Sequence, residues 1–234
     1  SLWLENLDQA NKKNNSKVFA SAPIYQLKSD SIRSNRDGNL LKIRQGLQDL
    51  PEARLEVKGL EKMFQGKFLT ELEATESAFK KNAGDYAVIH LAMHGLLNTQ
   101  YPILSSLAFT ENGDSIEDNF LQAYEVSNMN LNAALVVLSA CETGYGKFQQ
   151  GEGVISLARS FMYAGVPSLV VSLWQVNDAS TAKIMTLFYQ NLSEGMDKAE
   201  ALRTAKLEYL KTVNVEFAGH PVFWAAFIQI GDSR

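Results

Sequence analysis

The 234-residue chain carries 22 Lys and Arg against 26 Asp and Glu, and this slightly acidic balance without a basic, aromatic stripe argues against a nucleic-acid-binding face. Its longest apolar runs have the length of strands and fall far short of the ~18–20 residues of a membrane-spanning helix. The single cysteine excludes an intramolecular disulfide and is typical of a reducing compartment, so we expect a cytoplasmic protein. Because the sequence opens on Ser1 without a signal-peptide pattern, we expect one domain, 1–234, from the C-terminal part of a longer protein.

The first third of the chain has weak hydrophobic periodicity. Residues 18–24 (VFASAPI) predict a short strand, and the polar residues 28–40 predict a loop. Pro51 suits the first turn of a helix, because that position needs no backbone N–H. A second short strand at 67–70 and a helix at 74–81 follow.

Three later apolar runs have the composition of strands that are buried on both faces: 86–93, 133–140 and 168–174. Around them the sequence predicts a hairpin excursion at 105–126, a helix at 151–165 and a last strand at 221–230. Two further helices are predicted, from Asn177 or Asp178 to Gly195 and from Asp197 to about 211, the second of them opened by a capping pair of Asp197 and Glu200. Strands that alternate with amphipathic helices are typical of an α/β fold. We therefore expect a three-layer α/β/α sandwich with a mostly parallel central sheet.

The only cysteine, Cys141, directly follows the run 133–140, and His94 directly follows the run 86–93. Open α/β sheets bind their ligands beyond the carboxyl ends of the strands. If the two strands are neighbours, ~4.8 Å apart, the thiol and the imidazole can face each other. His94 could then take the thiol proton, the thiolate could attack a carbonyl, and the N–H groups of Gly95 and Cys141 could hold the oxyanion.

Other patterns in the sequence do not predict a metal site or a cofactor site. His90 and His94 are four residues apart, which on a strand separates them by ~13 Å, so no metal site is predicted and His90 is expected to support the site from within its strand. The glycines after Cys141 complete neither a phosphate-binding nor a dinucleotide-binding pattern, and no cofactor is predicted. The alternative for Cys141 is a buried structural cysteine.

A resemblance to a known family is carried by four segments: VIHLAMHG, LVVLSACETGYG, GEGVISLARSFMYAGVPSLVVSLWQVND and PVFWAAFIQIGD. They are similar to the CHAT domain, a family of caspase- and separase-like cysteine peptidases that is often fused to TPR repeats. The resemblance covers about residues 50–234. The family usually has a further segment ahead of the first strand, and this sequence shows no such segment. Residues 28–40, in turn, have no clear counterpart in the family. It implies a caspase-like fold with His94 and Cys141 as the catalytic dyad and Gly95 beside the oxyanion site. The dyad separation of 47 residues is close to the ~50 of caspases.

We therefore expect a cysteine endopeptidase that acts on a protein or peptide substrate, with water completing the reaction. N-terminal repeats in the longer protein are expected to hold the site inactive until a partner binds. Two alternatives stay open: a CHAT-like module that binds a partner protein without catalysis, and an acyltransferase that uses the same dyad.

Two further residues are candidates for substrate binding. Asp178 follows the strand at 168–174, and the stretch SLWQVND resembles the separase and CHAT segment whose aspartate lies in the specificity pocket. The resemblance implies a preference for a basic residue before the cut bond, since Arg binds a carboxylate bidentately. Alternatively, Asp178 caps a helix, unless Asn177 does so. Trp174, at a strand end, either lines the site or packs in the core.

Overall fold

A computed structural model describes residues 17–25, 44–98, 100–112, 116–139, 152–174, 176–213 and 217–233, with side chains in the helix that begins at Glu152 described from Leu157 onward. Six strands form the main sheet in the order β2-β1-β3-β7-β8-β9. They are β1 (Val18–Pro23), β2 (Gly66–Glu71), β3 (Val88–Leu91), β7 (Leu135–Leu138), β8 (Ser168–Ser172) and β9 (Phe227–Gly231). Five of them run parallel, and β9 is antiparallel to β8 at one edge.

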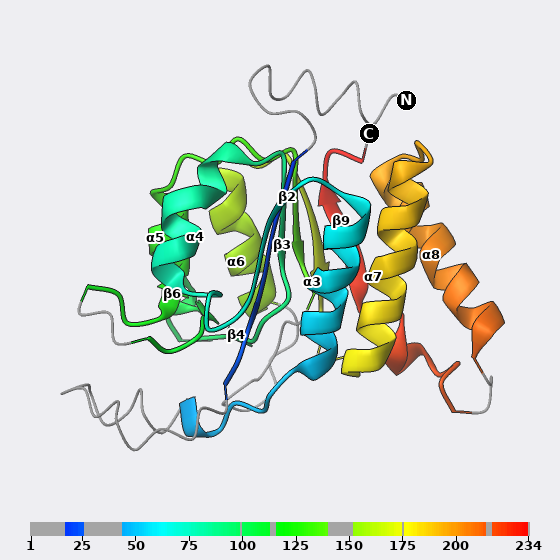
Figure 1. Cartoon of the computed structure of the whole chain (residues 1–234), viewed down its shortest axis with the longest axis horizontal. Helices are drawn as coiled ribbons and strands as arrows, with labels where there is room; N and C mark the ends of the chain where they lie inside the picture. The colour runs from blue at the N-terminus through cyan, green and yellow to red at the C-terminus, as the bar shows by residue number, and fades with distance from the viewer. Residues whose placement is uncertain are drawn as a thin grey trace.

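Helices cover both faces of this sheet (Figure 1). One face carries α3 (Pro51–Met63), α7 (Asp178–Ser193) and α8 (Lys198–Thr212), and the other carries α4 (Glu76–Asn82), α5 (Ala123–Ser127) and α6 (Glu152–Tyr163). Short 3-10 turns are η1 (Ala83–Asp85), η2 (Pro102–Leu104) and η3 (Pro221–Phe223). The predicted three-layer α/β/α sandwich with a mostly parallel sheet is therefore confirmed.

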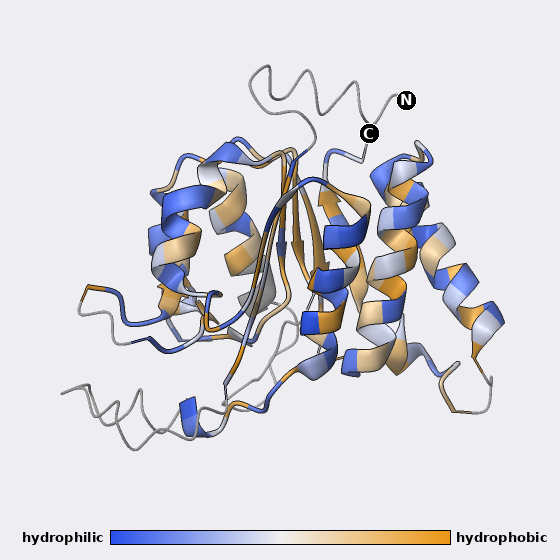
Figure 2. Cartoon of the chain, in the orientation of Figure 1, coloured by the Kyte–Doolittle hydropathy of each residue, from blue (hydrophilic) through white to orange (hydrophobic). Residues whose placement is uncertain are grey.

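The central strands are mostly apolar because each of them is covered twice; their polar residues are His90 in β3 and Ser168 and Ser172 at the two ends of β8. Every residue of β3, β7 and β8 is buried, and the colouring of Figure 2 shows the strands as hydrophobic while the outer faces of the helices are hydrophilic. Alternate strand residues feed two separate cores, so Ile89 packs towards α4, α5 and α6 while Val88 packs towards α3, α7 and α8. This double burial explains the mostly apolar runs in the sequence.

A second, smaller sheet follows the carboxyl end of β3. It is antiparallel and contains β4 (Gly95–Leu96), β5 (Ser106–Ala108) and β6 (Phe120–Gln122). The predicted hairpin excursion is thus present, but its second half is only partly a strand. The chain turns into helix α5 at Ala123, where Gln122 and Glu125 form a reciprocal capping box.

Glycine is required at two places for different reasons. A Cβ on Gly66 would lie 1.8 Å from the carbonyl oxygen of Val18, so only glycine lets β2 run this close to β1. Gly165 has a φ of +104° and ends α6, as the sequence predicts.

Two other expectations need correction. Asp197 stands at the N-cap of α8 but its side chain caps nothing, and Glu200 accepts a hydrogen bond from Arg203 instead of closing a capping box. The last strand begins only at Phe227, because residues 221–223 form a 3-10 turn. The predicted loop at 28–40 lies outside the described residues. Across the described ranges, every helix is too short or too polar to cross a bilayer.

Candidate active site

His94 lies at the carboxyl edge of the main sheet, between β3 and β4, with only 3% of its surface exposed. Its Nε2 is 2.7 Å from the carbonyl oxygen of Gln48. Because a carbonyl can only accept, Nε2 carries the proton and the lone pair of the neutral ring is on Nδ1. Burial holds the pKa of His94 below its ordinary value, against the opposing effect of the Gln48 carbonyl. The imidazole is therefore neutral near pH 7 and can accept a proton at Nδ1.

Cys141 lies outside the described residues, as do all of residues 140–151. The strand that leads to it, β7, is paired with β3 up to its last residue. Leu138, the last residue of β7, is paired with Leu91, the last residue of β3, and the N–H of Ser139 still donates to the Leu91 carbonyl at 3.1 Å. His94 and Cys141 each follow three residues after this last matched pair.

Gly95 begins β4 opposite Leu107 of β5. The neighbouring pair is hydrogen-bonded, since Ala108 N–H donates to the His94 carbonyl at 2.9 Å. Hydrogen-bonded and non-hydrogen-bonded pairs alternate along an antiparallel ladder. The backbone N–H of Gly95 therefore points away from β5 and is not used by the sheet.

Asp178 is the first residue of α7, but Asn177 is the residue that caps this helix, with its Oδ1 accepting from Ser180 N–H at 3.2 Å. The alternative that Asp178 caps its own helix is thus wrong. Its Oδ2 instead accepts from the N–H of Glu52, in the first turn of α3, at 2.9 Å. Burial raises the pKa of Asp178, and the Glu52 N–H acts in the opposite direction.

Trp174 follows β8 and is partly buried. Its indole Nε1–H donates to the carbonyl oxygen of Val222 at 3.0 Å. The indole therefore ties the end of β8 to the segment that precedes β9, and its N–H is occupied within the fold.

His90 lies in the middle of β3, fully buried, as a strand residue with polar partners. Its Nε2 is 2.9 Å from Oε1 of Glu56 on α3, and its Nδ1 is 3.1 Å from the hydroxyl of Tyr189 on α7. His90 and His94 thus have separate sets of partners. The expectation that His90 is a hydrogen-bonded strand residue agrees with these contacts, while Glu56 and Tyr189 carry no signal in the sequence that would mark them.

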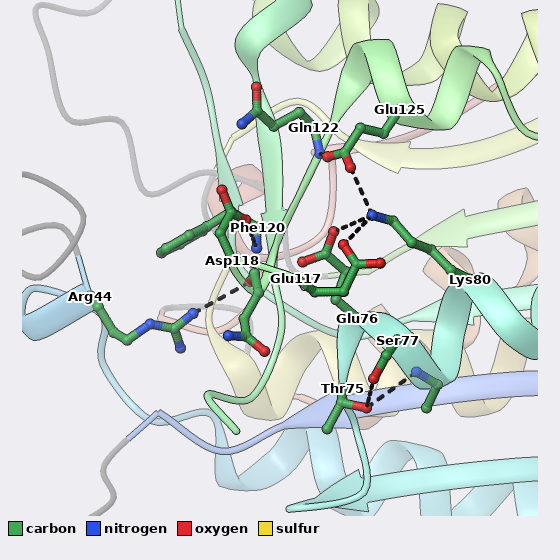
Figure 3. A network of polar contacts seen from close by, with 12 residues as sticks. Arg44, Thr75, Glu76, Ser77, Lys80, Glu117, Asp118, Phe120, Gln122 and Glu125 are labelled. Atoms are coloured by element: carbon green, nitrogen blue, oxygen red, sulfur yellow. Dashed lines mark hydrogen bonds and ion pairs between the residues drawn. The ribbon is translucent and has the colours of Figure 1, made fainter. Parts of the chain in front are cut away.

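A second group of charged residues lies on the opposite layer of the fold, around Lys80 of α4 (Figure 3). The Lys80 Nζ is 2.8 Å from Glu76, 2.6 Å from Glu117 and 2.7 Å from Glu125. Among the described residues these three carboxylates lie close enough to share one cation, and the ammonium group of Lys80 stands between them. Burial raises the pKa of Glu76 to about 7, although Lys80 opposes this effect.

The chain resembles known proteins at the level of sequence and of fold. It matches the family described as CHAT domain over residues 6–232. It is 34% identical over 117 residues to Tetratricopeptide repeat protein 28 of Homo sapiens, covering 50% of this chain and 4% of that protein. The Mus musculus protein of the same name is 29% identical over 141 residues, covering 56% of this chain and 6% of that protein. The chain thus spans a small part of the length of these curated relatives, which are repeat proteins by name.

Among solved structures, the complex of the pro- and mature domains of Porphyromonas gingivalis RgpB has a TM-score of 0.53. The sequence identity is 9%, and the likeness covers 99% of this chain and 52% of that chain. It therefore concerns the fold, which is caspase-like. Because the family match extends over nearly the whole sequence, this chain belongs to the CHAT domain family.

Proposed function

We propose that this CHAT domain is a cysteine endopeptidase in which Cys141 is the nucleophile and His94 is the general base. The observation that carries the proposal is the state of His94 at the carboxyl edge of the sheet. The Gln48 carbonyl takes the proton-bearing Nε2, so Nδ1 is left as the basic nitrogen. The matched ends of β3 and β7, each followed by one dyad residue after three positions, support the pairing of His94 with Cys141.

The reaction follows from these roles. Nδ1 of His94 takes the proton from the thiol, and the sulfur attacks the carbonyl carbon of the scissile peptide bond. The N–H groups of Gly95 and Cys141 donate to the oxyanion, a role for which the Gly95 N–H is free of the β4–β5 pairing. His94 then gives its proton to the leaving amine, and a thioester remains. Water, deprotonated by His94, hydrolyses the thioester and restores the thiol, so no cofactor is needed.

Asp178 is our proposed determinant of a preference for Arg or Lys before the cut bond. Its Oδ2 is bound to the Glu52 N–H, while no described residue donates to its Oδ1. Glu52 and Glu56 add negative charge around the carboxylate, which favours a cationic side chain, while Arg54 acts in the opposite direction. Trp174 is proposed to line the same site with its ring, whose N–H is tied to the Val222 carbonyl.

The first test uses the fact that Cys141 is the only thiol. Iodoacetamide should alkylate it faster in the folded protein than in a free-thiol peptide at pH 7, because His94 increases its thiolate fraction. His94→Ala should slow the reaction about tenfold or more. His220→Ala is the matched control, because His220 is exposed and caps the η3 turn. Equal rates for the wild type and His94→Ala would contradict the dyad.

The second test concerns specificity. Asp178→Asn keeps an acceptor for the Glu52 N–H, so the stability should change by less than about 0.5 kcal/mol. A peptide-library cleavage profile of the wild type should favour Arg and Lys before the cut bond, and Asp178→Asn should lose this preference. A wild type that prefers acidic or apolar residues there would refute the role of Asp178.

A second candidate function is a partner-binding module without catalysis. It is favoured by the names of the curated relatives, which describe tetratricopeptide repeats and state no activity. We propose that such repeats in a longer protein hold the site inactive until a partner binds, so the isolated chain should hydrolyse substrates faster than the longer protein without its partner. Equal turnover by the 234-residue chain and by the longer protein would count against this regulation. Transfer of the acyl group to an added amine rather than to water would identify the acyltransferase alternative.

A further inference from the structure

Tyr25 holds the backbone of His94 through a hydroxyl bridge. The Ala108 N–H donates to the His94 carbonyl directly, but the reciprocal bond of this pair is not made directly. The His94 N–H donates to the Tyr25 hydroxyl at 3.1 Å, and the same hydroxyl donates to the Ala108 carbonyl at 2.8 Å. One side-chain hydroxyl thus completes the pairing of His94 with β5. The Tyr25 ring also packs against the imidazole, with the centroids 4.8 Å apart.

The carbonyl that receives His94 Nε2–H is held by an ion pair one residue further along. Asp49, next to Gln48, accepts two hydrogen bonds from Arg54 of α3, at 2.8 Å and 2.6 Å. The Arg54 guanidinium holds the pKa of Asp49 below its ordinary value, so the carboxylate is charged near neutral pH. The N–H of Tyr25 also donates to Asp49 at 3.4 Å, which connects the ion pair to the bridge.

These contacts form one arrangement around the ring of His94. The segment after β1 supplies Tyr25, the segment before α3 supplies Gln48 and Asp49, and α3 supplies Arg54. The bidentate geometry restricts the backbone at Asp49, and therefore the direction of the preceding carbonyl. A ring whose backbone, face and Nε2 are all held has one orientation and one neutral tautomer.

We propose that Tyr25 and the Asp49–Arg54 ion pair are positioning residues that hold His94 in the Nε2–H tautomer, with Nδ1 presented as the base. Neither part touches the substrate. Tyr25 acts through the backbone and the face of the ring, and the ion pair acts through the Gln48 carbonyl. The inference rests on the proposed role of His94 for its functional consequence, but the tautomer itself is a property of the free protein.

The direct test is the ¹⁵N–¹H correlation spectrum of protein labelled in its imidazole nitrogens. The wild type should show His94 with the proton on Nε2. Tyr25→Phe keeps the ring and removes the hydroxyl, and Asp49→Asn removes the charge; both should mix the two tautomers. Tyr209→Phe is the matched control, because that buried hydroxyl also has two partners, far along the chain from His94, and should leave the spectrum unchanged. With three histidines, His220→Gln and His94→Ala assign the signals.

The kinetic readout is the pH profile of Cys141 alkylation. Tyr25→Phe and Asp49→Asn should each lower the rate at pH 7 about five- to tenfold, the effect of one lost hydrogen bond. Asp49→Asn should also move the limb that reports His94 to lower pH, because the Asp49 charge favours the imidazolium. Loss of rate in the Tyr209→Phe control to the same extent, or an Nε2–H signal unchanged in both site variants, would overturn the proposal.

The two readouts separate this inference from the proposed function. If Cys141 of the wild type reacts no faster than a free-thiol peptide, the peptidase proposal fails, yet the tautomer of His94 and its response to the variants are still measured. If Tyr25→Phe does not fold, Asp49→Asn provides the same spectrum and the same rate comparison.

Discussion

The buried carboxyl of Glu76 makes the stability of the protein depend on pH. Its folded-state pKa is raised to about 7 from an ordinary value of 4.5, chiefly by burial. Between these two values the folded state binds more protons than the unfolded state, so the free energy of unfolding falls as pH rises. The contribution of this group to stability is fully present below pH 4.5 and is lost as pH rises through 7.

The expected magnitude follows from the same two pKa values. At about 1.4 kcal/mol for each pKa unit, the interval corresponds to about 3 kcal/mol of unfolding free energy. The Glu76 side chain is only 1% exposed, so solvent screening removes little of this effect. Lys80 limits it, because its ammonium group lies 2.8 Å from the carboxylate and favours the ionised form (Figure 3).

The assay is urea unfolding of the wild type and Glu76→Gln at intervals from pH 4 to pH 8. Glutamine keeps the shape and removes the titration, so the variant should gain about 3 kcal/mol relative to the wild type between pH 4.5 and pH 8. Glu200→Gln is the control, because that half-exposed side chain contacts Arg203 and Thr204 on the surface of α8. A difference between the wild type and Glu76→Gln that stays constant over this range would refute the reasoning.

Three other substitutions test contacts within the fold by urea unfolding. Glu56→Ala should cost about 1–3 kcal/mol, because it leaves the buried Nε2 of His90 without the carboxylate that lies 2.9 Å away; a loss below about 0.5 kcal/mol would contradict the pairing. Gly66→Ala should cost about 3 kcal/mol, since the new Cβ meets the Val18 carbonyl; a neutral effect would mean that β2 can move away. Asn177→Ala should cost about 1 kcal/mol through loss of the α7 cap, with Asn177→Asp as the variant that should retain stability.

Hydrophobic pattern alone determined the layers of the fold. The runs around 88–91, 135–138 and 168–172 are apolar except for His90, Ser168 and Ser172, and such runs occur where helices cover both faces of a parallel sheet. The same pattern predicted that His94 stands at the carboxyl edge, because it follows one of these runs directly. Burial of a segment depends on its own composition, so the residues of that segment alone predict whether it is buried.

Local rules were less reliable where two interactions competed for the same residue. Asn177 and Asp178 both suit the start of α7, and the structure assigns the cap to Asn177. The Oδ2 of Asp178 instead accepts a hydrogen bond from the N–H of Glu52 in α3, which lies 126 residues away in the sequence. Similarly, residues 119–126 have strand-like composition, but the capping box between Gln122 and Glu125 begins a helix inside them.

The partners of His94 were decided by the tertiary structure alone. Tyr25 is 69 residues from His94 and Gln48 is 46 residues away, and neither residue belongs to a motif. Their contacts depend on β1 pairing beside β3 and on α3 starting at the same edge of the sheet. Sequence periodicity specifies which face of an element is buried, but not which element lies against it. The nitrogen that carries the proton on His94 therefore follows from the order of the strands, and the sequence contains no local signal for it.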